Sequence, residues 1–310
     1  MSLLTTLKIH DFKYRVSYRT LFSWPRQLQV YSGTLDPIAE IALPPMLAES
    51  QGFLLRAIPV QVEPRLAAGQ DSGLLRYVLQ EFPRYYIDMA GMDFDGYKAQ
   101  FSGKTRSTIQ RKVKKFVEHC GGSLRWQTYR SPEEIRAFWS LARAISSKTY
   151  QERLLQAGLP DDAQYQRQAE AWAANDGLRA YLLFDGDRPV SYLFCPIRDG
   201  VIDYAFLGYD PEYQRHSVGT VLQWLALESL FAERRYRFFD FTEGESDHKR
   251  LFATGHLDCA HIAMLRPTWA NRFLVRSHQG FNRAVEALGR WLERKQLKSR
   301  IQRLLRGGAA

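Results

Sequence analysis

The residues most suggestive of chemistry in this 310-residue sequence form the turn from Gln214 to Thr220. A strand is predicted before the turn, at 201–207, and a helix after it, at 218–234. The first N–H groups of a helix have no acceptor within the helix, and the helix dipole adds about half a positive charge there. Gly219 lets an anion approach the backbone, and Arg215 and His216 supply side-chain donors. The pattern predicts a site for an anion such as a pyrophosphate.

The elements that must position this turn follow from the apolar periodicity and the turn residues. Ser131-Pro132 is typical of a helix start, and Asp185-Gly186 is typical of a hairpin. We expect helices at 105–120, 131–141, 161–175, 218–234 and 246–252, and strands at 124–129, 178–184, 189–197, 201–207, 236–241 and 260–265. This order predicts an α+β fold with a mainly antiparallel sheet and one strand–helix–strand crossover.

The turn itself carries a family resemblance. Gln214-Arg215-His216-Ser217-Val218-Gly219-Thr220 resembles the acyl-CoA pyrophosphate loop of GNAT acetyltransferases, with Ser217 at the position of that loop's first glycine. The Ser-x-Gly-Thr variant is similar to the GNAT branch of CelD-like cellulose-biosynthesis proteins, which is related to FemAB-type transferases.

Two further motifs resemble the same branch. One is Phe101-Ser102-Gly103-Lys104-Thr105-Arg106, which is followed by a basic helix. The other is the segment from Phe239 to Lys249, similar to Asp-Phe-x-x-Gly-x-x-x-Tyr-Lys, with His248 in place of the tyrosine. The resemblance covers roughly residues 95–265.

The resemblance implies the GNAT fold, a mixed and mainly antiparallel twisted sheet flanked by helices. In that fold the strands 201–207 and 236–241 splay apart and hold the thioester arm between them. Acyl-CoA is then a co-substrate, and no bound cofactor or metal is expected. The resemblance places donor binding at Leu207, Gly208, Gln214, Arg215, His216, Ser217, Val218, Gly219 and Thr220.

Aminolysis of a thioester needs a base for the amine, a donor to the oxyanion and a proton for the leaving thiolate. The candidate bases are Asp203, Asp240 and Glu243. We prefer Glu243, which follows a strand end beside a glycine. Only one of Asp203 and the next residue can face the cleft, because strand side chains alternate. His248 and Lys249 are candidates to stabilise charge or donate a proton.

These four catalytic candidates also have purely structural interpretations. Asp240 lies between two phenylalanines and can tie the following loop, while Glu243 can be a solvated loop acid. His248 and Lys249 can be exposed helix residues. The sequence leaves both interpretations open.

Composition divides the chain into three parts. Residues 1–92 are predicted to form a strand-rich N-terminal lobe, which is either a degenerate GNAT-like domain or an extension. Residues 93–265 form the GNAT-like domain, and 266–310 a basic helical tail, with the helix expected over 281–305. The N-terminus has no signal-peptide core and no apolar run is long enough to cross a bilayer, so we expect a cytoplasmic protein.

The positive charge is concentrated in two segments. The net charge is +10, with six basic residues and no acid in 104–115, and eleven basic residues against two acids in 266–306. Each segment is either a solvated basic face or a contact for an anionic membrane or polyanion. Stacking aromatics are not interleaved with the basic residues, so no specific nucleic acid is predicted. The three cysteines lack the spacing of a disulfide framework or zinc site.

The sequence therefore predicts an N-acyltransferase that moves an acyl group from acyl-CoA to an amine of an unidentified acceptor, either a small molecule or a cell-envelope precursor. Two alternatives remain. One is a Fem-like transferase that uses aminoacyl-tRNA, and the other is a non-catalytic polyanion-binding protein on a GNAT scaffold.

Overall fold

The structure is a computed structural model that describes residues 6–17, 19–33, 35, 43–62, 73–149 and 158–294. The chain forms two compact units. The terminal unit combines the residues up to Phe82 with those from Asp258 onward, and the central unit runs from Pro83 to Leu257. The division at 92/93 and 265/266 stays a prediction, and the expected helix beyond residue 294 lies outside the described residues.

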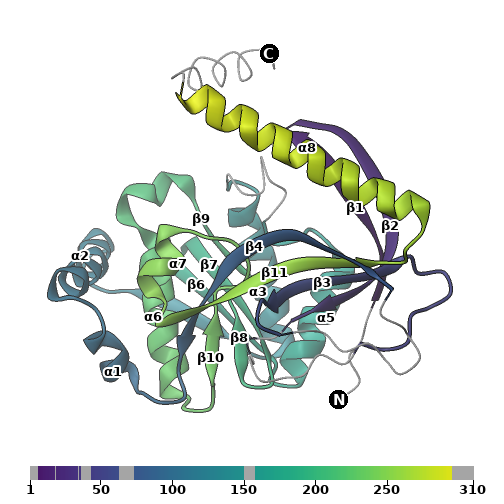
Figure 1. Ribbon diagram of the computed structural model, residues 1–310. Helices are drawn as coiled ribbons and strands as arrows, with labels where there is room; N and C mark the ends of the chain where they lie inside the picture. Colours follow the sequence, from purple (N-terminus) through teal and green to yellow (C-terminus); the bar gives the residue numbers. More distant parts are fainter. Residues whose placement is uncertain are drawn as a thin grey trace. The chain divides into compact units, whose positions relative to one another are not determined.

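The described part of the terminal unit is built on strands and a long helix (Figure 1). The elements are β1 (Thr6–Val16), β2 (Arg19–Ser32), β3 (Gly52–Pro59), β11 (Gly255–Leu265) and α8 (Trp269–Arg294). β1 pairs antiparallel with β2, β2 pairs parallel with β3, and β3 pairs antiparallel with β11. The chain passes between the units within β11 and within β4 (Leu75–Asp88).

Helix α8 begins earlier than the sequence pattern indicated. It starts at Trp269, not near residue 281, and the Thr268 hydroxyl accepts from the N–H of Asn271 (3.2 Å). The helix packs on β1, where the Tyr14 hydroxyl lies 2.7 Å from the Ser277 hydroxyl. Leu274 is fully buried in the core of this unit. A Pro-Thr helix start was thus present in the sequence and was missed.

The central unit holds the remaining strands and helices. The strands are the end of β4, β5 (Arg125–Tyr129), β6 (Leu178–Asp185), β7 (Arg188–Arg198), β8 (Val201–Asp203), β9 (Phe206–Tyr209) and β10 (Phe238–Asp240). The helices are α1 (Phe94–Ala99), α2 (Gly103–His119), α3 (Pro132–Ser146), α5 (Ala163–Ala174), η1 (Pro211–His216), α6 (Val218–Ala232) and α7 (Asp247–Phe252). The strand order is β4-β10-β8-β7-β6-β5, with β9 also paired to β7. Among the strand pairs described in this unit, β8–β10 is parallel and the others are antiparallel. The predicted α+β class with a mixed, mainly antiparallel sheet flanked by helices is confirmed.

Two hydrophobic layers cover the faces of this sheet. Tyr181 and Leu183 of β6 pack into the layer that contains α6, and Leu182 and Phe184 pack into the layer that contains α3 and α5. All four side chains are almost fully buried because strand residues alternate between the two faces. Helix α6 is apolar nearly all round, as expected of a helix buried within a domain.

One predicted strand is two strands in the structure. The sequence indicated a single strand at 201–207, but β8 ends at Asp203 and β9 begins at Phe206. β8 pairs with β10, whereas β9 pairs with β7 alone among the described strands. At the break, the N–H of Tyr204 donates to Asp240 O (2.8 Å) and that of Ala205 to Phe194 O (3.2 Å). The expected splaying of the strands therefore begins at Tyr204.

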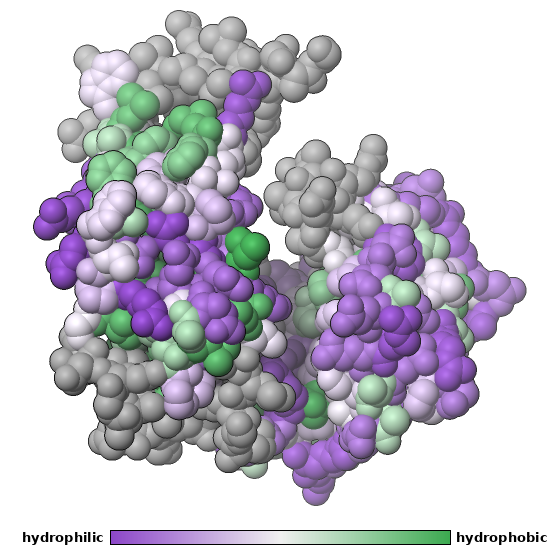
Figure 2. Space-filling model, turned by 90° about the vertical axis from the view of Figure 1, so that its right-hand side faces the viewer, coloured by the Kyte–Doolittle hydropathy of each residue, from purple (hydrophilic) through white to green (hydrophobic). Residues whose placement is uncertain are grey.

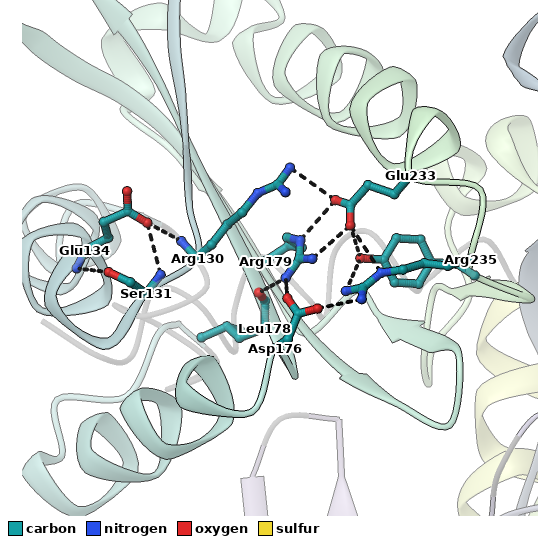
Figure 3. Close-up of polar contacts among 9 residues, drawn as sticks. Arg130, Ser131, Glu134, Asp176, Leu178, Arg179, Glu233 and Arg235 are labelled. Atoms are coloured by element: carbon teal, nitrogen blue, oxygen red, sulfur yellow. Dashed lines mark hydrogen bonds and ion pairs between the residues drawn. The ribbon is translucent and has the colours of Figure 1, made fainter.

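A buried ion network fixes the C-terminal end of α6 (Figure 3). Arg179 of β6, only 2% exposed, donates to both carboxylate oxygens of Glu233, at 3.0 and 2.8 Å. Tyr236 donates to the same carboxylate (2.7 Å) and Arg130 lies 3.2 Å from it. Burial alone would raise the pKa of Glu233, but the hydrogen bonds from Arg179 and Tyr236 lower it. The end of α6 distant from the turn at Ser217 is thus held on the sheet.

Candidate active site

A pocket of about 870 Å³ opens where β8 and β10 separate. One wall is the segment from Tyr204 to Leu207, and another is the start of α6 from Ser217 to Thr220. The third wall is the loop after β10 and the start of α7, including Glu243, His248 and Lys249. The structure thus brings most of the predicted donor-binding residues together with three of the four predicted catalytic residues.

The N-terminus of α6 faces this pocket without a side-chain cap. Ser217 has a left-handed backbone (φ 53°) and gives no capping hydrogen bond to the helix. Its carbonyl accepts the first intrahelical bond, from the N–H of Val221 (3.1 Å). The first-turn N–H groups therefore have neither a helical acceptor nor a cap, which suits an anion bound at this end.

The two glycines predicted for the donor site, Gly208 and Gly219, have different structural roles. A Cβ on Gly219 would lie 3.1 Å from Leu207 Cδ2 and 3.4 Å from Tyr209, both of which line the pocket. A Cβ on Gly208 would lie 2.4 Å from the ring of Tyr192, which is fully buried in the other layer. Gly219 therefore keeps the mouth of the pocket open, whereas Gly208 allows β9 to pack on the core.

Arg215 and His216 do not line the pocket. His216 is 8% exposed, and its ring centroid lies 4.3 Å from that of His119 on α2. Arg215 Nε donates to His216 Nε2 (3.2 Å). Burial, followed by the charges of His119 and Arg215, lowers the pKa of His216. The predicted contacts of these two side chains with the donor stay untested, and Gln214 is the one residue of 214–216 that lines the pocket.

Glu243 and Lys249 lie together in the third wall. Glu243 is exposed in a loop with left-handed residues at Thr242 (φ 57°) and Gly244 (φ 92°). Lys249 Nζ donates to the carbonyl oxygen of Glu243. Burial lowers the pKa of Lys249, while the nearby carboxylates of Asp240 and Glu243 act to raise it. A carboxylate that can accept a proton therefore neighbours an ammonium group that releases one more readily than usual.

His248 is neutral at physiological pH. Burial, with the charges of Lys112 and Lys249, lowers its pKa to about 4. Its Nε2 is hydrogen-bonded to Gln223 Oε1, and an amide oxygen only accepts, so Nε2 carries the ring proton and Nδ1 is an acceptor. Gln223 is fully buried in α6, and its Nε2 has no partner among the described residues. Sequence analysis missed this residue, although an amide within an apolar helix is an available signal.

Asp240 is enclosed outside the pocket. The side chain is 0% exposed, and Arg84 Nε donates to both carboxylate oxygens (3.1 and 3.0 Å). The N–H of Thr242 also donates to Asp240 (2.8 Å). These contacts tie together β4, β10 and the loop after β10, in agreement with the structural interpretation of this residue. A catalytic role for Asp240 stays untested.

The alternation predicted for Asp203 and its neighbour is resolved by the pocket. Tyr204 lines it and Asp203 does not. Asp203 is the register partner of Asp240 on β10, and side chains opposite each other in a sheet share a face. Burial and then the charge of Asp240 raise the pKa of Asp203, against a lowering effect of Arg198. Asp203 therefore belongs to the sheet face away from the pocket.

Among the residues that the structure describes, no group of three or more His, Cys, Asp or Glu side chains is arranged to hold a metal ion. Within the same residues, no helix is both long and apolar enough to cross a membrane. The expectations of no metal and of a cytoplasmic location stay predictions.

The splayed strands, the uncapped helix start and the acid and ammonium groups lie together in one part of the central unit. Residues 103–250 match the family model described as acetyltransferase (GNAT) domain. The GNAT part of the predicted resemblance is thus supported, and the CelD-like branch stays a prediction.

Several solved structures are similar to parts of this chain at low sequence identity. One is the C-terminal domain (DUF2156) of an Agrobacterium fabrum protein provisionally described as a lysylphosphatidylglycerol synthetase, with 10% identity, a TM-score of 0.49, and coverage of 74% of this chain and 71% of that chain. FemX has 11% identity, a TM-score of 0.48, and coverage of 73% and 75%. A GCN5-related N-acetyltransferase from Kribbella flavida has 16% identity, a TM-score of 0.34, and coverage of 61% and 60%. No curated protein matches the chain significantly. At these values the likenesses do not decide between donors.

Proposed function

We propose that the protein is an N-acyltransferase that uses acyl-CoA to acylate an amine of a small molecule or a cell-envelope precursor. The observation that carries the proposal is the shared pocket. The uncapped start of α6 and the pair Glu243–Lys249 face the same cavity of about 870 Å³. A single donor can place its pyrophosphate at the start of α6 and its thioester near Glu243 and Lys249.

Donor binding follows from the walls of the pocket. The N–H groups from Val218 to Thr220 would hold the pyrophosphate, with Gln214 beside them. The thioester arm would run along the segment from Tyr204 to Leu207, which lies at the separation of the strands. Because β10 does not pair with β9, the backbone of this segment can hydrogen-bond to the amides of the arm.

The chemistry is an addition followed by an elimination. The amine nitrogen attacks the thioester carbonyl carbon, the C–S bond then breaks, and an amide and a free thiol result. Glu243 would accept the proton that the amine loses, directly or through a water molecule. Lys249 would give a proton to the leaving sulfur, a role that its lowered pKa supports. His248 has its Nε2 proton engaged by Gln223 and would act as a neutral hydrogen-bond acceptor.

A second donor class has its own support. Of the six basic residues in 104–115, only Lys112 is not exposed, so α2 presents a strongly basic face. Such a face fits the phosphates of an aminoacyl-tRNA, the alternative donor, or another polyanion. Acyl-CoA is preferred because the pocket itself offers one pyrophosphate-sized anion site, and the acceptor remains an unidentified amine.

The test is thermal unfolding with CoA, acetyl-CoA and longer acyl-CoAs. A ligand at about 100 times its dissociation constant stabilises the folded state by about 2.7 kcal/mol. We expect a rise in Tm that depends on the acyl chain, and amine-dependent release of free thiol. If near-millimolar thioester gave no rise in Tm and charged tRNA gave a rise that salt weakens, the donor would be aminoacyl-tRNA and not acyl-CoA.

A further inference from the structure

Helix α8 of the terminal unit has an unusually apolar outward side. Its inward side is formed by Asn271, Leu274 and His278, which are 2%, 0% and 8% exposed. Trp269 is nevertheless 82% exposed, and Phe273, Leu288 and Trp291 are 58%, 49% and 52% exposed. At 100° per residue, Trp269, Phe273 and Trp291 lie within about 40° of one another. The helix therefore carries a second apolar stripe that faces solvent.

A row of arginines borders this stripe. The four are one or two helical turns apart, lie within a sector of about 40°, and are all exposed. They are Arg272, Arg276, Arg283 and Arg290. Glu286 lies beside the row, 3.8 Å from Arg290. The outward side of α8 is thus a narrow aromatic stripe with a positively charged edge.

The β1–β2 ribbon extends the apolar surface. Leu21 and Phe22 of β2 are 64% and 54% exposed. The ring of Phe22 lies 6.2 Å from that of Trp24, which lies 6.0 Å from that of Phe273 on α8. Figure 2 shows hydrophobic side chains gathered over this part of the surface, with hydrophilic ones beside them. We call these residues the α8 face: Leu21, Phe22, Trp269, Phe273, Leu288, Trp291 and the four arginines.

We propose that the α8 face docks on the surface of an anionic phospholipid bilayer. Exposed tryptophans beside arginines are the composition of helices that lie in the interfacial plane, where the rings enter the headgroup region and the guanidinium groups meet lipid phosphates. The positive edge complements a negative surface, and each arginine near such a surface raises binding about fivefold.

The test uses the full-length protein and vesicle flotation. We expect binding to vesicles of phosphatidylglycerol and phosphatidylcholine, little binding to phosphatidylcholine alone, and loss of binding in high salt. The double variant Trp269→Ser/Phe273→Ser should bind at least tenfold more weakly, because each ring buries a large apolar area. Arg276→Glu/Arg283→Glu should lose the preference for the anionic lipid. Leu251→Ser, 45% exposed in the central unit, is the matched control and should bind normally.

Two results would overturn the proposal. One is undiminished vesicle binding by Trp269→Ser/Phe273→Ser, which would place the contact elsewhere. The other is a dimer in size-exclusion chromatography that this variant abolishes, without vesicle binding by either protein, which would make the α8 face an interface between copies. Both variants change exposed side chains, and an unchanged circular dichroism spectrum verifies that they fold.

Discussion

Replacing Gly219 by tryptophan tests the assignment of the donor loop most directly. The glycine lies at the second position of α6, and a Cβ there points toward Leu207 and Tyr209 at 3.1 and 3.4 Å. The backbone of Gly219 is helical, so the substitution brings no left-handed strain. An indole ring at this point would occupy the mouth of the pocket and cover the N–H groups that face it. Donor binding should therefore fail while the fold persists.

The size of the effect follows from the hydrogen bonds that are lost. A hydrogen bond to a charged group contributes about 1.5–3 kcal/mol, so losing two weakens binding by about 10²–10⁴-fold. For the unchanged protein at about 100 times the dissociation constant, the ligand adds about 2.7 kcal/mol, or roughly 5–10 °C in Tm. For Gly219→Trp, a hundredfold weaker affinity leaves about 0.4 kcal/mol, or about 1 °C.

Differential scanning fluorimetry measures the Tm of each protein without ligand and the rise in Tm that acyl-CoA causes. The ligand-free Tm of Gly219→Trp reports on the cost of crowding Leu207 and Tyr209, expected at about 1–3 kcal/mol. Gly289→Trp is the control, because nothing lies within 4 Å of a Cβ added to that helical glycine of α8. If Gly219→Trp kept the full ligand-induced shift, the start of α6 would not be the donor site.

Three further predictions concern the surroundings of the pocket. Arg84→Met should destabilise the fold by about 3–5 kcal/mol in chemical unfolding, because it leaves the buried Asp240 unpaired; a loss below 1 kcal/mol would contradict the buried pair. Glu243→Gln should lower kcat by about 10²–10⁴ with the donor dissociation constant unchanged, and an unchanged kcat would remove Glu243 as the base. The pKa of a histidine is 6.5 in the unfolded chain, and that of His248 is about 4 in the folded protein. Between pH 6.5 and pH 4 the unfolded chain therefore binds more protons than the folded protein. The free energy of unfolding is thus highest above pH 6.5 and falls as the pH is lowered to 4. His248→Gln should reduce that loss by up to about 3 kcal/mol in urea unfolding, and identical pH profiles would show that the pKa is not lowered.

Local signals predicted the frame of the central unit well. Asp185-Gly186 marks the turn between β6 and β7, and Gly186 has the left-handed backbone (φ 57°) that such a turn requires. Ser131 and Glu134 form a complete capping box at the start of α3. The hairpin turn and the capping box each depend on residues within four positions of each other, so both can be predicted from the local sequence.

Long-range pairing explains what the sequence could not show. Arg84 meets Asp240, and Gln223 meets His248, across 156 and 25 positions of the chain. The break at Tyr204 has a similar origin, because the segment is a continuous β-type run whose partner changes from β10 to β7. Local propensity predicts one continuous strand for this run, and the division into β8 and β9 arises from the positions of the partner strands β10 and β7.

The two ends of α6 differ in a way that bears on function. At the C-terminal end Glu233 is unfavourable for the helix dipole, yet Arg179 and Tyr236 surround it and fix the helix on β6. At the N-terminal end a serine is present, but its left-handed backbone prevents it from capping, which costs about 1 kcal/mol relative to a capped helix. A ligand that accepts from the same N–H groups would offset that cost. We therefore expect an anion to bind at the uncapped start of α6, on a helix whose opposite end Arg179 holds on the sheet through Glu233.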